Sequence, residues 1–200
     1  MDGLDLPFQW DDGVCVSPFV ASTELSMEML AQWLDNPSRL GNTHTLAVTD
    51  LGCGNGSALL ALSSALFKLR GEVRPLNLSI VGIDIDASLI EAAKQAAAAA
   101  TTTMTTTIPS LHCFKCTFEV ADLCQLVVEQ YFPREEAAGH VLFLYLLPEA
   151  LDIIRETLLE ALQRVCFLVS NRWEVPFLSQ WRVTSVGTLH IYSYGKFKGH

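Results

Sequence analysis

Three glycines within five residues, Gly52, Gly54 and Gly56, lie between a short apolar run and a helical pattern. The apolar run is Thr45–Asp50 and the helical pattern is Ser57–Arg70. Glycine is needed where the backbone bends sharply and a ligand must approach without a Cβ in the way. A strand, a bare turn and a helix in this order predict an α/β domain, which binds ligands beyond the carboxyl ends of its parallel strands.

The same alternation continues along the chain and predicts one mostly parallel sheet with helices between its strands. Further strands are expected over the apolar runs Leu76–Asp84, Leu111–Ala121, His140–Leu147 and Arg164–Ser170. Further helices are expected over Thr23–Leu34, Ser88–Ala100, Leu123–Tyr131 and Glu149–Gln163. The alternating segments Trp181–Ser185 and Thr188–Tyr194 flank a Val-Gly turn and predict a closing antiparallel hairpin.

The length of 200 residues suits one domain, and the sequence has no convincing internal repeat. We expect an irregular N-terminal segment over residues 1–17 and a single domain over residues 18–200. Ala96–Thr107 is a low-complexity run that reads AAAAATTTMTTT. Its alanine half is expected to extend the preceding helix and its threonine half to form a loop, because threonine favours helices less than alanine.

Composition excludes several classes of protein. Hydrophobic residues make up 50% of the chain and charged residues 18%, which excludes global disorder. The net charge of −9 disfavours nucleic acid as the main partner and favours a cationic ligand or a basic protein substrate. The N-terminus has no targeting pattern, and no run is long and apolar enough to span a membrane. We therefore expect a cytoplasmic protein, small enough also for the nucleus, with no membrane contact.

The six cysteines are scattered at positions 15, 53, 113, 116, 124 and 166, and we expect them to be reduced. Cys113 and Cys116 have the spacing of half a zinc site, but the chain offers no second pair of ligands. Residues three apart on a strand also point to opposite faces. We therefore expect no metal.

Two acidic residues indicate which ligand the glycine turn binds. Asp84 ends the second strand, where its carboxylate can accept both hydroxyls of a ribose. A dinucleotide site has the pattern G-x-G-x-x-G, but Ser57 stands at the third glycine position here. Asp50, two residues before the first glycine, would repel a pyrophosphate and attract an ammonium group. S-adenosylmethionine carries an ammonium and a sulfonium but no phosphate, so it fits this turn better than a dinucleotide.

Three segments carry a resemblance to a known family. Asp50–Gly56 resembles motif I of the class I, seven-β-strand, S-adenosylmethionine-dependent methyltransferases, while Val81–Asp86 and Val120–Leu123 resemble its second and third motifs. The resemblance covers residues 18–196 and implies an α/β, Rossmann-like three-layer sandwich, with a mostly parallel seven-stranded sheet and a C-terminal antiparallel hairpin. It also implies S-adenosyl-L-methionine as cofactor, bound by Ser22, Asp50, Gly52, Gly54, Asn55, Asp84, Ile85, Asp122, Leu123 and Tyr145.

A narrower likeness lies outside those motifs. Ser17–Ser22, Leu144–Glu149, Val169–Trp173 and Thr188–Tyr192 resemble a subgroup that includes the protein-lysine methyltransferases of the ATP synthase c-subunit and the adenine nucleotide translocase. This likeness implies methylation of a protein side chain, with lysine favoured. The catalytic residues it implies lie at the ends of the fourth and fifth strands and are Tyr145, Asn171 and Trp173, with Glu149 and Glu174 in reserve.

Each catalytic candidate has a physical role. The rings of Tyr145 and Trp173 suit a cationic acceptor by cation–π contact, and the Asn171 amide suits a hydrogen bond from an amine. Two other functions stay open: a methyltransferase-like scaffold that binds a partner without activity, and a methyltransferase acting on a small molecule or RNA. Nucleic acid would require a basic partner subunit, and the sequence predicts no oligomeric state.

Overall fold

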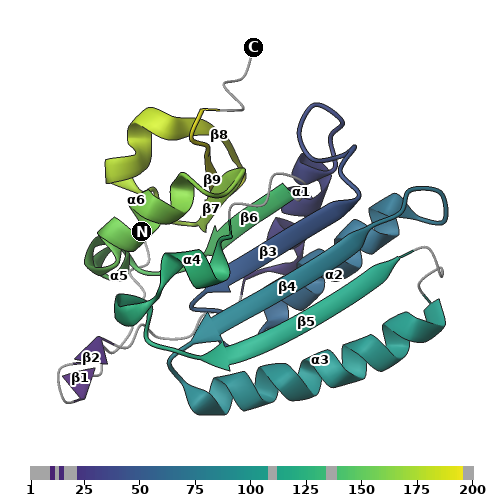
Figure 1. The fold of residues 1–200 in the computed structure, drawn as a ribbon, viewed down its shortest axis with the longest axis horizontal. Helices are drawn as coiled ribbons and strands as arrows, with labels where there is room; N and C mark the ends of the chain where they lie inside the picture. The colour runs from purple at the N-terminus through teal and green to yellow at the C-terminus, as the bar shows by residue number, and fades with distance from the viewer. Residues whose placement is uncertain (1–9, 12–13, 16–21, 108–111, 134–138, 196–200) are drawn as a thin grey trace.

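A seven-stranded sheet runs through the computed structural model, which describes residues 10–11, 14–15, 22–107, 112–133 and 139–195 (Figure 1). The strand order is β5-β4-β3-β6-β7-β9-β8. The strands are β3 (Thr45–Leu51), β4 (Asn77–Asp84), β5 (Cys113–Val120), β6 (Gly139–Leu144), β7 (Phe167–Asn171), β8 (Arg182–Val186) and β9 (Leu189–Tyr192). The first five in this order are parallel, and β9 runs antiparallel to both β7 and β8. The predicted fold class, including its closing hairpin, is confirmed.

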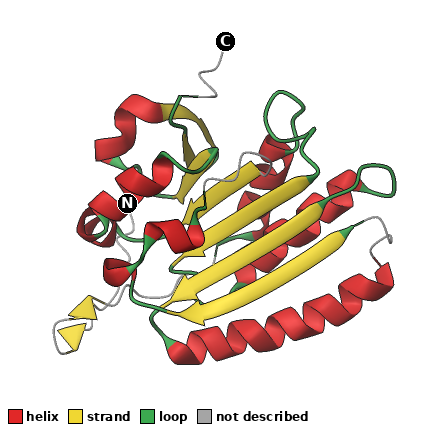
Figure 2. Ribbon diagram, viewed as in Figure 1, coloured by secondary structure: helices red, strands yellow, loops and turns green. Residues whose placement is uncertain are grey.

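Helices cover both faces of the sheet, as Figure 2 shows. One buried cluster joins the sheet to α1 (Glu24–Leu34), α2 (Ser57–Arg70) and α3 (Ala87–Thr107). A second cluster, on the other face, joins it to α4 (Val128–Tyr131), α5 (Pro148–Ile153) and α6 (Arg155–Leu162). The molecule is therefore the three-layer sandwich that the sequence predicts.

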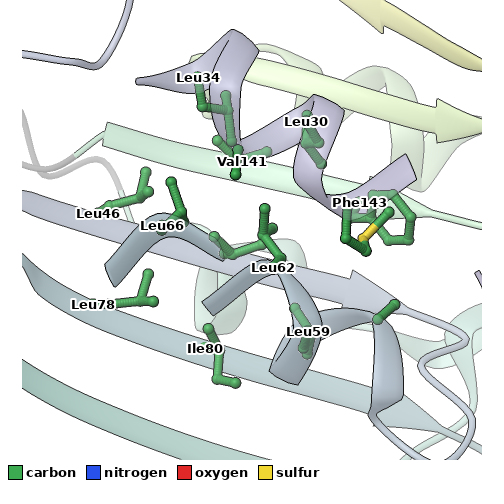
Figure 3. Close-up of a cluster of buried hydrophobic side chains, with 14 of the residues drawn as sticks. Leu30, Leu34, Leu46, Leu59, Leu62, Leu66, Leu78, Ile80, Val141 and Phe143 are labelled. Carbon is green, nitrogen blue, oxygen red and sulfur yellow. The ribbon is translucent and has the colours of Figure 1, made fainter. Parts of the chain in front are cut away.

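Leucine spacing explains the larger cluster. In β3 and β4, the alternate residues Leu46, Leu78 and Ile80 point to one face, while Leu59, Leu62 and Leu66 repeat every three or four residues along α2 (Figure 3). Each of these side chains is at most 2% exposed. Burying one such side chain contributes about 1.5–3 kcal/mol, so this layer stabilises the sheet that carries the site.

A buried ion pair braces the amino-terminal side of the domain. The Arg70 Nε atom, at the end of α2, lies 2.5 Å from Asp35 Oδ1, just after α1. The Arg70 guanidinium also donates to the carbonyl oxygens of Leu40 and Thr43 at 3.0 and 3.1 Å. Arg74 pairs with the second oxygen of Asp35 at 2.7 Å. These bonds tie the connection between α1 and β3 to the end of α2.

Three local predictions are wrong, and all three concern helices. The threonine half of Ala96–Thr107 is helical, because α3 continues to Thr107. Alanine propagates a helix well. The Thr101 hydroxyl donates to the Ala97 carbonyl at 2.8 Å, a bond that is compatible with the helical backbone. Within residues 1–17, the structure describes two short strands, β1 (Trp10–Asp11) and β2 (Val14–Cys15), which pair antiparallel.

The other two errors concern breaks within predicted helices. Leu123–Tyr131 divides into the 3₁₀ turn η1 (Leu123–Gln125) and α4, because Leu126 and Val127 are extended. Glu149–Gln163 divides at Ile154, whose φ of −93° and ψ of 22° separate α5 from α6. A 3₁₀ helix over Pro176–Trp181, η2, was not predicted. In the described ranges, no helix is long and apolar enough to cross a membrane.

Candidate functional site

The carboxyl ends of four neighbouring strands form one edge of the sheet. In β3, Leu51 pairs with Ile83 of β4 and with Leu144 of β6. Leu144 pairs in turn with Ser170 of β7. The residues that follow these positions therefore emerge side by side at this edge, about 5 Å apart from strand to strand. They include Gly52, Asp84, Tyr145 and Asn171, which the sequence assigns to the site.

The turn after β3 requires glycine by both conformation and space. Gly52, Gly54 and Gly56 have φ values of 81°, 53° and 74°, in the left-handed region. A Cβ on Gly52 would lie 2.5 Å from Leu146 Cδ2, and one on Gly56 would lie 2.6 Å from the Phe118 ring. The turn therefore presents backbone, without side chains, to the edge of the sheet.

Asp84 joins this turn to the next strand. Its Oδ2 accepts a hydrogen bond from the Gly54 amide at 2.8 Å, and its Oδ1 accepts one from the Asp86 amide at 3.0 Å. A carboxylate oxygen has two lone pairs, so each oxygen retains one acceptor position. Asp84 is partly exposed, which leaves those positions accessible for the ribose contact that the sequence predicts.

Asp50 is a buried carboxylate with an unsatisfied oxygen. The residue is 2% exposed, and its Oδ1 has no hydrogen-bond partner among the described residues. Burial, and second the charge of Asp84, raise the pKa of Asp50 well above its usual value. Buried polar atoms are normally paired, so an orphaned acceptor at the base of a bare turn indicates a missing donor.

The remaining cofactor candidates occupy the rim of the same edge. The Asp122 side chain caps η1 by accepting from the Cys124 amide at 2.9 Å, and it also accepts from the Gln125 side chain at 3.1 Å. This cap fixes the position of Leu123. Asn55 accepts from the Ser57 amide at 3.2 Å, at the start of α2. Ile85 is 38% exposed and presents an apolar surface beside Asp84.

The catalytic candidates lie at the same edge but in different environments. Tyr145 packs against the cluster of α1–α3, whereas Trp173 packs against the cluster of α4–α6. The two rings therefore belong to opposite faces of the sheet, which does not favour a shared cation–π channel. Glu149 is exposed in the first turn of α5, and Glu174 is paired with Arg182 at 2.9 Å.

Asn171 uses both ends of its amide. Its Nδ2 donates to the Ser22 hydroxyl at 3.1 Å, and its Oδ1 accepts from the Thr188 hydroxyl at 2.7 Å. The residue is 4% exposed. Asn171 thus brings Ser22 to the site and ties it to the β8–β9 turn. This arrangement suits a positioning residue better than one that contacts an amine. Ser17–Ala21 of the narrower resemblance lie outside the described residues.

One feature of the site was not predicted. Arg172 has a φ of 71°, and its guanidinium lies over the Trp173 ring, 5.4 Å from the centroid. No local sequence signal marks this conformation, because left-handed residues are mostly glycine or asparagine. Elsewhere, Cys53, Cys113, Cys116 and Cys166 form no disulfide, and the described residues contain no group of three or more metal-ligating side chains that could hold an ion.

Comparisons with known proteins agree with this geometry. Residues 42–129 match the family model of a methyltransferase domain. No curated protein sequence matches the chain with significance. An RNA methyltransferase from Salinibacter ruber, solved with S-adenosyl-L-homocysteine, has 18% identity and a TM-score of 0.54, with 86% of this chain and 91% of that chain covered.

Two further solved structures resemble the chain. CalS11, a TDP-rhamnose 3'-O-methyltransferase of calicheamicin biosynthesis, has 15% identity and a TM-score of 0.54, with 86% of this chain and 79% of that chain covered. SCL7 from Oryza sativa has 14% identity and a TM-score of 0.53, with 76% and 43% covered. These likenesses show the fold. The family model matches less than half of the chain, and the solved structures confirm the predicted Rossmann-like fold class.

Proposed function

We propose that the chain transfers a methyl group from S-adenosyl-L-methionine to a protein side chain, with lysine as the favoured acceptor. The observation that carries this proposal is the pairing of a bare glycine turn with two carboxylates, Asp50 and Asp84. Their negative charge suits a cationic nucleoside and opposes a pyrophosphate. The match to a methyltransferase domain covers this same segment.

The residues present fit this cofactor. Asp84 has one free lone pair on each oxygen for the ribose hydroxyls, and the unpaired Oδ1 of Asp50 suits the positively charged end of the ligand. The absence of side chains at Gly52 and Gly54 lets a ligand lie against the backbone. Ile85 supplies an exposed apolar surface for the flat base. When bound, the cofactor supplies a methyl group that its positive sulfur has already activated.

The chain then has to hold the acceptor in line with that methyl group and exclude water. The ends of β6 and β7 are next to the glycine turn in the sheet, so the acceptor is expected there. Tyr145 and Trp173 are half-buried at these two strand ends, one on each face of the sheet. A lysine acceptor must lose its proton before it reacts, and a poorly solvated site favours the neutral amine.

A protein acceptor follows from charge and from the narrower sequence likeness. The net charge of −9 attracts basic proteins and repels nucleic acid. The RNA methyltransferase among the structural neighbours resembles this chain only in fold. That likeness does not indicate RNA as the methyl acceptor of this chain.

Two measurements test the proposal. Calorimetry with S-adenosyl-L-homocysteine tests whether the turn binds the cofactor. Incubation of the protein with labelled S-adenosyl-L-methionine and extract from cells that lack it tests transfer, and mass spectrometry identifies the product. We expect label on lysine in a protein. Tight binding with no labelled product in any fraction would instead establish the scaffold function, and label in RNA or small molecules would establish a different acceptor.

A further inference from the structure

The chain makes an unusually tight turn where β7 ends. The Trp173 amide donates to the Asn171 carbonyl at 2.9 Å, which together with the φ of 71° at Arg172 is the pattern of a γ-turn. Arg172 is the one non-glycine residue with positive φ in the part of the chain that the structure describes. A side chain in this conformation costs about 1–3 kcal/mol, and such residues concentrate at functional sites.

Surrounding hydrogen bonds hold the turn in place. The Arg172 amide donates to the Thr188 carbonyl at 2.7 Å, and the Ser170 hydroxyl donates to the Trp173 carbonyl at 2.7 Å. The Asn171 side chain accepts from the Thr188 hydroxyl. Bonds on both sides of Arg172 therefore maintain a backbone that glycine would adopt without strain.

The Arg172 guanidinium has no acidic partner in the part of the chain that the structure describes. Arg172 is exposed, and its charged group lies over the Trp173 ring without an ion pair to any described residue. The nearest carboxylate along the chain, Glu174, is paired with Arg182 at 2.9 Å. Arg39 and Arg155 also lie over rings without an ion pair among the described residues, so what distinguishes Arg172 is its place just after β7, at the edge of the candidate site.

The position of Arg172 separates it from the cofactor acids. Asp50 and Asp84 belong to β3 and β4, while Arg172 follows β7, with β6 in between. At about 5 Å per strand, two strand spacings put roughly 10 Å between the β3 and β7 ends. The two cofactor acids therefore lie on one side of this edge, whereas Arg172 lies at the strand ends where the acceptor is expected, together with the exposed Glu149 and Glu174.

We propose that Arg172 is a specificity residue that binds a carboxylate of the protein acceptor, from an Asp or Glu next to the methylated lysine. This inference rests on the proposed function and refines its substrate. Guanidinium binds carboxylate through a rigid, bidentate fork, and stacking on Trp173 limits the orientations of that fork. An acidic neighbour would otherwise be repelled by this acidic protein, so Arg172 selects it locally.

The variant Arg172→Gly separates recognition from structure. It removes the guanidinium, and glycine adopts a φ of 71° without strain. The unfolding midpoint in urea should therefore stay level or rise. We expect methyl transfer to sites with an acidic neighbour to fall at least about tenfold, the effect of losing one charged hydrogen bond. Affinity for S-adenosyl-L-homocysteine should not change. A matched control is Arg155→Gln. Arg155 is also exposed and lies over a ring, 4.9 Å from the centroid of Phe177, but its backbone has no positive φ.

The assay uses extract from cells lacking the protein, incubated with trideuteromethyl S-adenosyl-L-methionine and then digested with chymotrypsin. Mass spectrometry should show labelled lysines enriched in Asp or Glu within two residues, and Arg172→Gly should abolish that enrichment while Arg155→Gln preserves it. Labelled lysines with no acidic enrichment, or loss of cofactor affinity in Arg172→Gly, would overturn this inference and leave the proposed function standing. Absence of label from every protein, or label in RNA alone, would overturn both.

Discussion

The Asp84 carboxylate accepts a hydrogen bond from the Gly54 amide at 2.8 Å, so the end of β4 is bonded directly to the turn that follows β3. The same side chain accepts from Asp86 at the start of α3. One carboxylate therefore orients the backbone on both sides of the proposed ribose position.

Asp84→Ala should lose most of the affinity for S-adenosyl-L-homocysteine. Two ribose hydrogen bonds to a charged acceptor disappear, which weakens binding by about 2–4 kcal/mol. Calorimetry measures this loss directly. Asp86→Ala is the matched control, because Asp86 accepts hydrogen bonds from Ser88 and Leu89 at the start of α3 and has no assigned cofactor contact. Binding by Asp84→Ala as tight as that of the parent would show that Asp84 does not hold the ribose.

Asp50→Asn should raise the free energy of unfolding at pH 7 by about 1 kcal/mol while weakening cofactor binding. Burial and the nearby Asp84 charge raise the pKa of Asp50, so its ionised form destabilises the empty protein. The amide removes that charge without changing the shape of the side chain. Urea unfolding and calorimetry on the same samples measure the two effects. An Asp50→Asn variant less stable than the parent would show that the Asp50 carboxylate has a stabilising partner in the folded protein.

Arg70→Ala should lower the free energy of unfolding by about 3–5 kcal/mol, because Asp35 loses its buried partner. The Arg70 side chain is 2% exposed and also satisfies two backbone carbonyls. Arg74→Ala is the control: that side chain is 41% exposed, and its loss should cost less than about 1 kcal/mol. Equal losses in the two variants would contradict the assignment of the brace to Arg70.

His140 should make stability depend on pH. Burial lowers the pKa of His140 to about 4 from its ordinary 6.5, and its Nε2 lies 3.0 Å from the Thr49 hydroxyl. The folded state holds the neutral ring, so its contribution is present above pH 6.5 and is lost as the pH falls toward 4. The full loss is about 3 kcal/mol.

Other groups also titrate in this range, so the comparison is between the parent and His140→Gln. Urea unfolding at several pH values from 7 to 4 should show a steeper fall for the parent, because the variant has no ring to protonate. Parallel curves for the two proteins would show that His140 does not titrate with a lowered pKa.

The sequence predicts the sheet well because local patterns determine it. The apolar runs predict β3 and β4, and the glycines after β3 predict the turn. The acids Asp50 and Asp84 lie at the ends of those two runs. The helix breaks at Leu126 and Ile154 were missed because tertiary packing, not propensity, sets them. The threonines of α3 were misread because a preceding alanine run can override weak propensity.

The arrangement of the side chains at the ends of β6 and β7 was less predictable, because it also depends on contacts between distant parts of the chain. Tyr145 and Trp173 were expected to act together, but their side chains pack against cores on opposite faces of the sheet. Asn171 bonds to Ser22, 149 positions earlier, and to Thr188, 17 positions later. Residue spacing in the sequence does not predict contacts over such separations. The strained Arg172 depends on those same long-range bonds.

The Asn171 amide couples an early and a late segment of the chain at the edge of the sheet where β7 ends. Ser22 precedes the first helix of the sandwich, and Thr188 lies in the final hairpin, yet a single buried side chain bonds to both. A change in the length of that hairpin would therefore alter the position of Ser22 through this one side chain, although the two residues lie far apart in the sequence.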